Sequence, residues 1–291
     1  MATIVPDDGF LQNEIEQLAI KAGDRILKAA ATVRTKTSRR DLVTSTDLEI
    51  QKMLMKRLDI FGSPCSFFCE EDLSVPGIRQ ITDPEQISKG VCFIIDPIDG
   101  TANFVHGLAH SCTSIAMTVG GETRIGVIYD PYHKELFSAC KGRGAWLNGH
   151  RLPELTAGST GSEADGSTGT ELHAARLSDM ITVFGTAPYD ESTNERTFRM
   201  AQMLYEMSGD VRRTGSAALD LCWTAAGRFG LYAELSLSAW DFAAGKLIAE
   251  ETGCVVTDID GQPLDWAGKH SILCGRPAFT KAFLEKQAEM E

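Results

Sequence analysis

The sequence predicts a mixed fold, in which an α+β lobe with an antiparallel sheet is followed by an α/β lobe. In the first half, two segments of helical periodicity precede a succession of short β-type runs, whereas strand-like and helix-like segments alternate after residue 170. The 291 residues suffice for one large domain or two fused lobes with a buried core. A hydrophobic content of 43% and a charged content of 23% exclude disorder, collagen and a coiled coil.

The first lobe is expected to contain two helices that pack on one sheet. Asp7 and Asp8 are good N-cap residues, and apolar residues recur at helical spacing after them, at Leu11, Ile15, Leu18, Ala22 and Ile26. A second helix is expected after the basic segment 34–40, capped by the sequence Ser45-Thr46-Asp47. Short β-type runs then follow at 91–95, 113–119, 124–129 and 135–139, and these indicate an antiparallel sheet.

A segment of low complexity separates the two lobes. Residues 157–170 consist mainly of Gly, Ser, Thr and Ala, which provide little apolar surface to bury. We therefore predict a surface loop or hinge at 155–170, between an N-terminal lobe of residues 1–154 and a C-terminal lobe of residues 171–291. In the second lobe, strands are expected at 180–184, 231–234 and 254–257, and helices at 195–208, 216–226 and 242–252.

Charge and cysteine content limit the partners and the compartment. Forty acidic and 28 basic residues give a net charge of −12, which predicts no nucleic-acid partner and no membrane partner. The eight cysteines include no Cys-x-x-Cys pair, so we expect reduced thiols and a cytoplasmic location. The N-terminal segment lacks the basic flank and apolar core of a signal peptide, which also makes secretion unexpected.

Six acidic residues are candidates for a functional site, because they follow apolar runs or begin helices. They are Asp47, Glu70, Glu71, Asp96, Asp99 and Asp241. Carboxylate oxygens without nearby His or Cys suit Mg²⁺. Asp96 and Asp99 are separated only by Pro-Ile, so both can face one point, and the N–H groups of Gly100 and Thr101 could hold a phosphate oxygen. An Asp-Pro-x-Asp-Gly sequence can also be a simple turn, but the further acids in apolar settings favour a site.

These residues resemble the inositol monophosphatase family of lithium-sensitive, magnesium-dependent phosphatases. Its two signature regions are similar to residues 93–104 (FIIDPIDGTANF) and 240–245 (WDFAAG). Residues 41–47 and 141–145, the pair Glu70-Glu71 and Glu234 also stand in the family's order, so the likeness covers nearly the whole chain. The resemblance implies a layered αβαβα sandwich of the sugar-phosphatase type, a homodimer and inhibition by Li⁺.

The resemblance also implies two or three Mg²⁺ ions per active site. The implied ligands are Glu70, Asp96 and the carbonyl of Ile98 for the first ion, Asp96, Asp99 and Asp241 for the second, and Glu70 for the third. The attacking water would lose its proton with help from Glu70 and Thr101, whose hydroxyl Asp47 would polarise. The second ion would stabilise the leaving alkoxide, and no phosphoenzyme is expected.

Substrate contacts follow from the same resemblance. The implied contacts are Asp99, Gly100, Thr101, Gly215, Ser216, Ala217 and Glu234, with Glu234 accepting hydrogen bonds from ring hydroxyls. Lys36 matches a family lysine on a mobile loop, and its alternative interpretation is a solvated surface lysine. Gly185-Thr186 stands where the family has Gly-Ser or Gly-Thr, whereas Ser236 replaces a common Gly.

The implied function is a Mg²⁺-dependent phosphomonoesterase that acts on inositol monophosphates or on a related small polyol or sugar phosphate. Alternatives within the superfamily are fructose-1,6-bisphosphatase, histidinol phosphatase, NADP phosphatase and 3′-phosphoadenosine 5′-phosphate phosphatase. The sequence Ala-Asn-Phe at 102–104, where the nucleotide-type enzymes have Lys-Glu-Phe, favours the polyol branch.

Two further hypotheses come from other classes. A regulatory or binding protein could use the same fold without catalysis, but every expected carboxylate is present. The sequence Asp-Ile-Asp-Gly at 258–261 imitates the nucleophile motif of haloacid-dehalogenase phosphatases. Because only thirty residues follow it, we interpret this motif as a hairpin turn.

Overall fold

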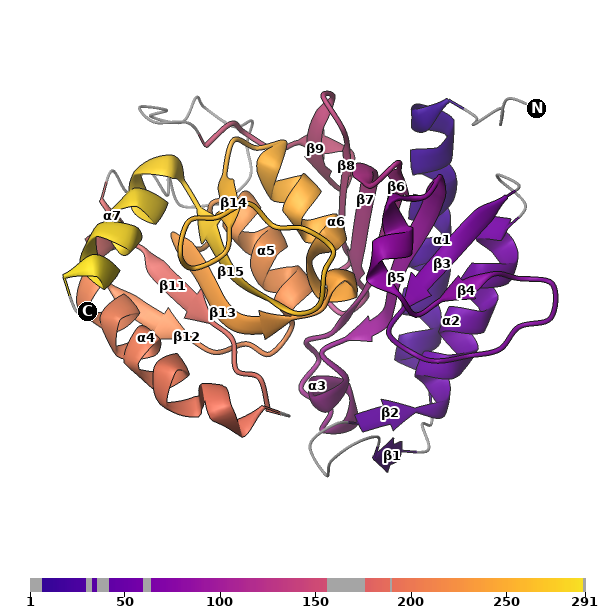
Figure 1. Cartoon of the computed structure of the whole chain (residues 1–291), viewed down its shortest axis with the longest axis horizontal. Helices are drawn as coiled ribbons and strands as arrows, with labels where there is room; N and C mark the ends of the chain where they lie inside the picture. The colour runs from indigo at the N-terminus through magenta and orange to yellow at the C-terminus, as the bar shows by residue number, and fades with distance from the viewer. Residues whose placement is uncertain are drawn as a thin grey trace.

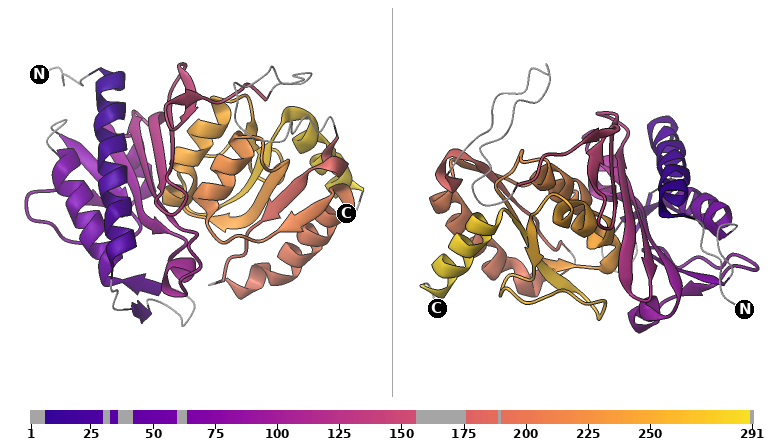
Figure 2. Two further views of the ribbon diagram at one scale, coloured as in Figure 1. Left: turned by 180° about the vertical axis from the view of Figure 1, so that it is seen from behind. Right: turned by 90° about the horizontal axis from the view of Figure 1, so that it is seen from above.

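Helices and sheets alternate in five layers in the computed structural model, which describes residues 7–29, 33–35, 42–59, 64–155, 176–188 and 190–289 (Figure 1). One outer layer holds α1 (Asp8–Lys28) and α2 (Ser45–Leu58). The central layer, between the two large sheets, holds α5 (Ala217–Ala225) and α6 (Ala239–Glu250). The other outer layer holds α4 (Asn194–Met207) and α7 (Pro277–Ala288). This order, seen edge-on in Figure 2, confirms the αβαβα fold class.

The first sheet has eight strands in the order β10-β9-β8-β7-β6-β5-β3-β4. Their bounds are β3 Cys65–Cys69, β4 Gln80–Ile81, β5 Val91–Asp99, β6 Cys112–Val119, β7 Glu122–Asp130, β8 Glu135–Cys140, β9 Gly144–Leu147 and β10 His150–Arg151. The expected antiparallel pairing holds from β5 to β10. It does not extend to β3, which pairs in parallel with both β4 and β5. Every residue of β3 is buried, as is typical of a strand covered on both faces.

The second sheet has five strands in the order β12-β11-β13-β15-β14. Their bounds are β11 Ile181–Phe184, β12 Asp210–Arg212, β13 Leu231–Leu237, β14 Val255–Thr257 and β15 His270–Gly275. The motif at 258–261 follows β14, where Gly261 N donates to Asp258 O (3.1 Å). It is therefore a turn at the start of the connection to the antiparallel strand β15, as predicted.

Several short elements complete the description. β1 (Val33–Thr35) and β2 (Leu42–Thr44) form an antiparallel pair, and α3 (Thr101–Val105) follows β5 directly. Short 3₁₀ helices span Pro84–Ser88, Leu177–Asp179 and Glu191–Thr193. No helix of the described residues is both long enough and apolar enough to cross a membrane.

Three hydrophobic clusters hold the layers together, and β5 contributes to two of them. Phe93 and Ile95 pack in the cluster beneath α1 and α2, whereas Cys92 and Ile94 pack in the cluster between the two sheets. A third cluster, which includes Leu204 and Phe283, lies between the five-stranded sheet and its outer helices. The continuous apolar run of β5 thus results from burial on both faces.

Two glycines allow α6 to pack closely on its neighbours. A Cβ atom on Gly126 of β7 would lie 2.7 Å from the carbonyl oxygen of Ala244, and one on Gly245 would lie 2.7 Å from the side chain of Leu221 in α5. Because α6 carries Asp241 in its first turn, this close packing also fixes one of the expected site residues.

Replacement of Gly126 by Ala should destabilise the protein by about 1–3 kcal/mol, because the new methyl group would overlap backbone atoms of α6 that cannot move independently. Urea denaturation measures the change. Gly9→Ala is the control, since a methyl group in the first turn of α1 meets only side-chain ends of Asp7 and Arg143. Equal midpoints for the two variants would contradict the proposed close packing.

Candidate active site

A cavity of about 120 Å³ brings together residues from both large sheets and from the helices between them. Its lining residues are Glu70, Asp96, Ile98, Asp99, Gly100, Thr101, Ala102, Gly185, Thr186, Pro188, Arg213, Gly215, Ala217, Glu234, Leu237 and Asp241. Most of the residues expected from the sequence are in this set. Asp47, Glu71 and Ser216 are not in it, and Lys36 lies outside the described residues.

A β-bulge places Asp96 and Asp99 in the same cavity. Asp96 pairs with Ser114 and Asp99 with Cys112, so three steps along β5 match two steps along β6. Without the bulge, residues three apart in a strand would point to opposite faces. Pro97 lies inside the bulge, where its missing N–H costs no regular ladder hydrogen bond. The two acids thus belong to the strand itself and do not merely follow it.

The backbone after Asp99 turns sharply at Gly100, whose φ is +84°. A Cβ atom there would lie 3.1 Å from the carbonyl oxygen of His110 and 3.2 Å from that of Gly215, so glycine fits this position best. Gly100 is the N-cap of α3 and caps no N–H group with a side chain. Gly100, Thr101 and Ala102 line the cavity at the start of this helix.

Asp241 and Asp47 are each held by a capping box at the start of a helix. Each is the third residue of its helix and accepts a hydrogen bond from the N-cap backbone, from Ser238 N (2.7 Å) and from Thr44 N (2.9 Å) respectively. The N-cap of α2 is therefore Thr44, one residue before the segment expected to cap it. One oxygen of each carboxylate serves the cap, which orients the other oxygen.

Asp96, Asp99 and Asp241 form a group that can bind a metal ion. One oxygen of each carboxylate lies within 4.8 Å of those of the other two. Asp96 is 2% exposed and Asp99 is 6% exposed. Burial, reinforced by the charges of neighbouring carboxylates, raises the pKa of Asp96 and of Asp241 well above its usual range. Burial also raises the pKa of Asp99 to about 6, although hydrogen bonds from Ser216 and Ala218 oppose the rise.

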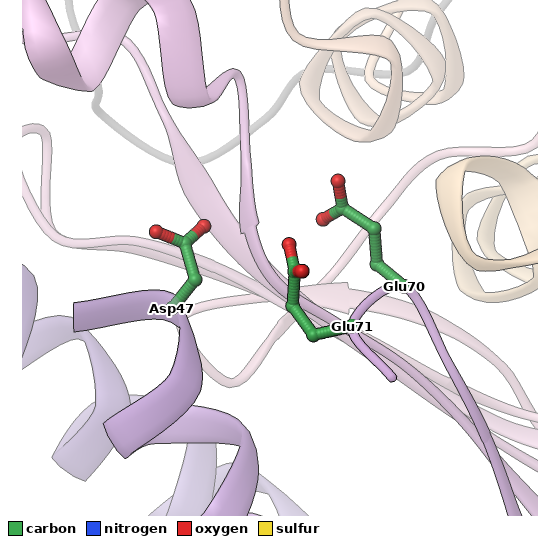
Figure 3. A group of neighbouring side chains, drawn as sticks. All are labelled: Asp47, Glu70 and Glu71. Carbon is green, nitrogen blue, oxygen red and sulfur yellow. The ribbon is translucent and has the colours of Figure 1, made fainter. Parts of the chain in front are cut away.

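A second acidic group lies beside the first and consists of Asp47, Glu70 and Glu71, whose ligand oxygens also lie within 4.8 Å of one another. Figure 3 shows Glu71 between the other two, with all three side chains projecting to one side. Burial raises the pKa of Asp47 to about 6, with Thr44 opposing the rise and Glu70 adding to it. Asp47 Oδ1 is buried and has no hydrogen-bond partner within the described part of the chain.

Two glutamines fix the turn that carries Glu70 and Glu71. The buried side chain of Gln51 in α2 pairs with the backbone of Glu71, donating to its carbonyl (2.7 Å) and accepting from its N–H (3.1 Å). Gln80 in β4 donates to the same carbonyl (2.6 Å). Neither glutamine belongs to a motif recognised in the sequence, because their partners are backbone atoms brought close only by the fold.

Two hydroxyl groups have partners other than the expected ones. Thr101 donates to the carbonyl of Ile98 (3.0 Å) and not to Asp47, whose Oδ2 accepts from Thr44. The Ser216 hydroxyl donates to Asp99, so Ser216 orients a carboxylate and does not form part of the cavity wall. Asp99 also accepts from Ala218 N (3.0 Å), which joins β5 to the first turn of α5.

The far wall of the cavity contains Glu234, which is 6% exposed. Tyr232 donates to its Oε2 (2.7 Å), and a Cβ atom on Gly185 would overlap its carboxylate. Burial raises the pKa of Glu234 to about 7, although Tyr232 and Arg213 oppose the rise. Arg213 also lines the cavity and was missed in the sequence, where it is one of two adjacent arginines in no recognised motif.

The donor set fits a hard divalent cation. Several buried carboxylates share one cavity and repel one another, and a bound cation would offset that repulsion. Oxygen ligands without sulfur or imidazole favour Mg²⁺ over Zn²⁺. The residues therefore fit the ion that the sequence resemblance implies.

Comparison with known proteins assigns the family. The model of the inositol monophosphatase family matches residues 10–290. The chain belongs to this family. Inositol-1-monophosphatase of Bacillus subtilis (strain 168) is 34% identical over 286 residues, which cover 94% of this chain and 96% of that protein. Nus factor SuhB of Escherichia coli (strain K12) is also 34% identical, over 272 residues that cover 91% of each chain.

Solved structures of other proteins show the same architecture. Extragenic suppressor protein SuhB from Bartonella henselae has a TM-score of 0.78 with 27% identity, covering 95% of this chain and 97% of that one. The IMPase of Thermotoga maritima has a TM-score of 0.75 with 28% identity, covering 96% and 98%.

Metal binding should stabilise this protein more at pH 7.5 than at pH 5. Folding raises the pKa of Asp47 and of Asp99 from about 4 to about 6. Between these two pH values the folded protein holds protons that the unfolded chain has already released. The free energy of unfolding of the metal-free protein therefore falls as the pH rises through this range. Mg²⁺ replaces those protons. At 100 times its dissociation constant it should add about 2.7 kcal/mol, a rise of about 5–10 °C in Tm.

Thermal melts with and without Mg²⁺ at the two pH values test this expectation, with K⁺ at equal ionic strength as the control. If Mg²⁺ raised the Tm as much at pH 5 as at pH 7.5, the ion would not be binding to ionised carboxylates.

Proposed function

We propose that this protein is a Mg²⁺-dependent phosphomonoesterase that hydrolyses inositol monophosphates or a related small polyol or sugar phosphate. The observation that supports this most strongly is the convergence of Asp96, Asp99 and Asp241 in one cavity with Glu70, Thr101 and Glu234. The carboxylates provide a metal-binding half of the cavity, and Glu234 provides a hydrogen-bonding half. Such a division suits a substrate with a phosphate at one end and hydroxyl groups at the other.

Glu70, Asp96, Asp99, Asp241 and the carbonyl of Ile98 would hold two or three Mg²⁺ ions. When bound, these ions would lower the pKa of a water molecule and neutralise negative charge on the phosphoryl group. The remaining contributions come from the chain itself. Glu70 lines the cavity and offers a carboxylate that can accept the proton of the attacking water.

The start of α3 would orient the phosphate. Gly100, Thr101 and Ala102 line the cavity at the first turn of a helix, where N–H groups lack intrahelical partners. Thr101 also ties its hydroxyl to the carbonyl of Ile98, which keeps that carbonyl close to the same turn. A phosphate bound there would lie between these N–H groups and the metal-binding carboxylates.

A non-catalytic role within the same fold is the alternative, and Nus factor SuhB is as similar to this chain as the Bacillus subtilis enzyme. The carboxylate group favours catalysis, because charges that repel one another destabilise a protein and a bound cation would offset that cost. The homodimer, Li⁺ inhibition, the cytoplasmic location and the hinge at 155–170 stay predictions.

Asp96→Asn should lower Mg²⁺-dependent phosphate release from myo-inositol 1-phosphate by more than about 100-fold, since even the partners of metal ligands matter 10- to 100-fold. Circular dichroism should show an intact fold. Asp258→Asn is the matched control, because Asp258 lies in the turn after β14 and should not affect turnover. Full activity of Asp96→Asn would overturn the site, and loss of activity in Asp258→Asn would favour an aspartyl-nucleophile enzyme.

A further inference from the structure

Arg213 is the one basic side chain among the described residues that line the cavity, where the titratable neighbours are acidic. It follows β12 and is exposed. Two of its N–H groups, Nε and Nη2, donate to the hydroxyl oxygen of Thr186 at 3.2 and 2.9 Å. A Cβ atom on Gly215 would overlap Nη1, so the guanidinium lies directly against the backbone of Gly215. The arginine is thus held across the cavity wall.

This arrangement determines what Thr186 can offer to a ligand. A hydroxyl oxygen has two acceptor sites and one proton. The two N–H groups of Arg213 occupy both acceptor sites. Thr186 can therefore act toward a substrate only as a hydrogen-bond donor.

Glu234 offers the complementary group on the same wall. Its carboxylate lies against Gly185, the residue next to Thr186, and its Oε2 accepts from Tyr232 (2.7 Å). The other oxygen, Oε1, is left to accept from a ligand. The wall thus presents one fixed donor and one fixed acceptor, and the charges of Arg213 and Glu234 offset each other.

We propose that Arg213 is a positioning residue that sets substrate specificity. By fixing Thr186 as a donor beside the acceptor Glu234, it selects monophosphates of uncharged polyols that carry two neighbouring hydroxyl groups. One such hydroxyl accepts from Thr186 and the other donates to Glu234. Because Glu234 offsets the charge of Arg213, this wall offers no net positive charge to a second phosphate, which disfavours bisphosphates. The proposal rests on the phosphatase function proposed above.

Steady-state phosphate release at pH 8 with saturating Mg²⁺ tests the proposal on three probes. These are myo-inositol 1-phosphate, which carries neighbouring hydroxyls, p-nitrophenyl phosphate, which carries none, and fructose 1,6-bisphosphate. Arg213→Gln should raise KM for myo-inositol 1-phosphate about tenfold, leave its kcat within about twofold, and leave both constants for p-nitrophenyl phosphate unchanged. Arg213→Lys should restore the KM only in part, because one ammonium group cannot occupy both acceptor sites of Thr186.

Two further variants separate this role from a structural one. Thr186→Val should cause the same rise in KM, and the double variant with Arg213→Gln should show no further rise, because both changes remove one interaction. Arg212→Gln is the matched control, since Arg212 pairs with Asp210 outside the cavity and should leave all constants unchanged.

The outcomes separate the two proposals. Wild-type protein that releases phosphate from none of the probes would overturn the phosphatase function and this inference with it. An active wild type whose KM values do not change in Arg213→Gln, or whose kcat falls equally on all probes, would overturn only the role of Arg213. A selective loss on fructose 1,6-bisphosphate would show that Arg213 binds a second anion, which also overturns it.

Discussion

Carboxylates that repel one another lie together at the centre of this fold. Asp96, Asp99 and Asp241 come from two parts of the chain and lie close enough to share one ion. Burial and neighbouring charge raise their pKa values, so the metal-free site is a source of instability. The packed layers around the site must supply the free energy that keeps these groups together until a cation offsets the repulsion.

Each acid is held by backbone geometry and not by a neighbouring base. A bulge in β5 turns Asp96 and Asp99 to one side, and capping interactions orient Asp47 and Asp241. Ser216 and the first turn of α5 hold Asp99 from the second half of the chain. The negative charge therefore stays available for a ligand, which explains how part of the net charge of −12 can serve an enzyme with an anionic substrate.

Local sequence patterns were sufficient to predict the helices and most strands. The periodicity of α1 and the short apolar runs of β5 to β8 each depend only on residues close together in the sequence. The αβαβα order and the ligand set came from resemblance to a family. Interactions between distant segments could not be predicted: the parallel pairing of β3, the bond from Ser216 to Asp99, and the support that Gln51 gives to Glu71. Arg213 was missed for the same reason, since only the fold brings it to Thr186.

Anomalous diffraction from a crystal soaked in Mn²⁺ can show whether these carboxylates form a metal centre. Mn²⁺ shares the oxygen-ligand preference of Mg²⁺ and can be located by its anomalous signal. We expect a strong peak among Asp96, Asp99 and Asp241, and at least one more beside Glu70. Peaks confined to surface carboxylates, with none in the cavity, would contradict it.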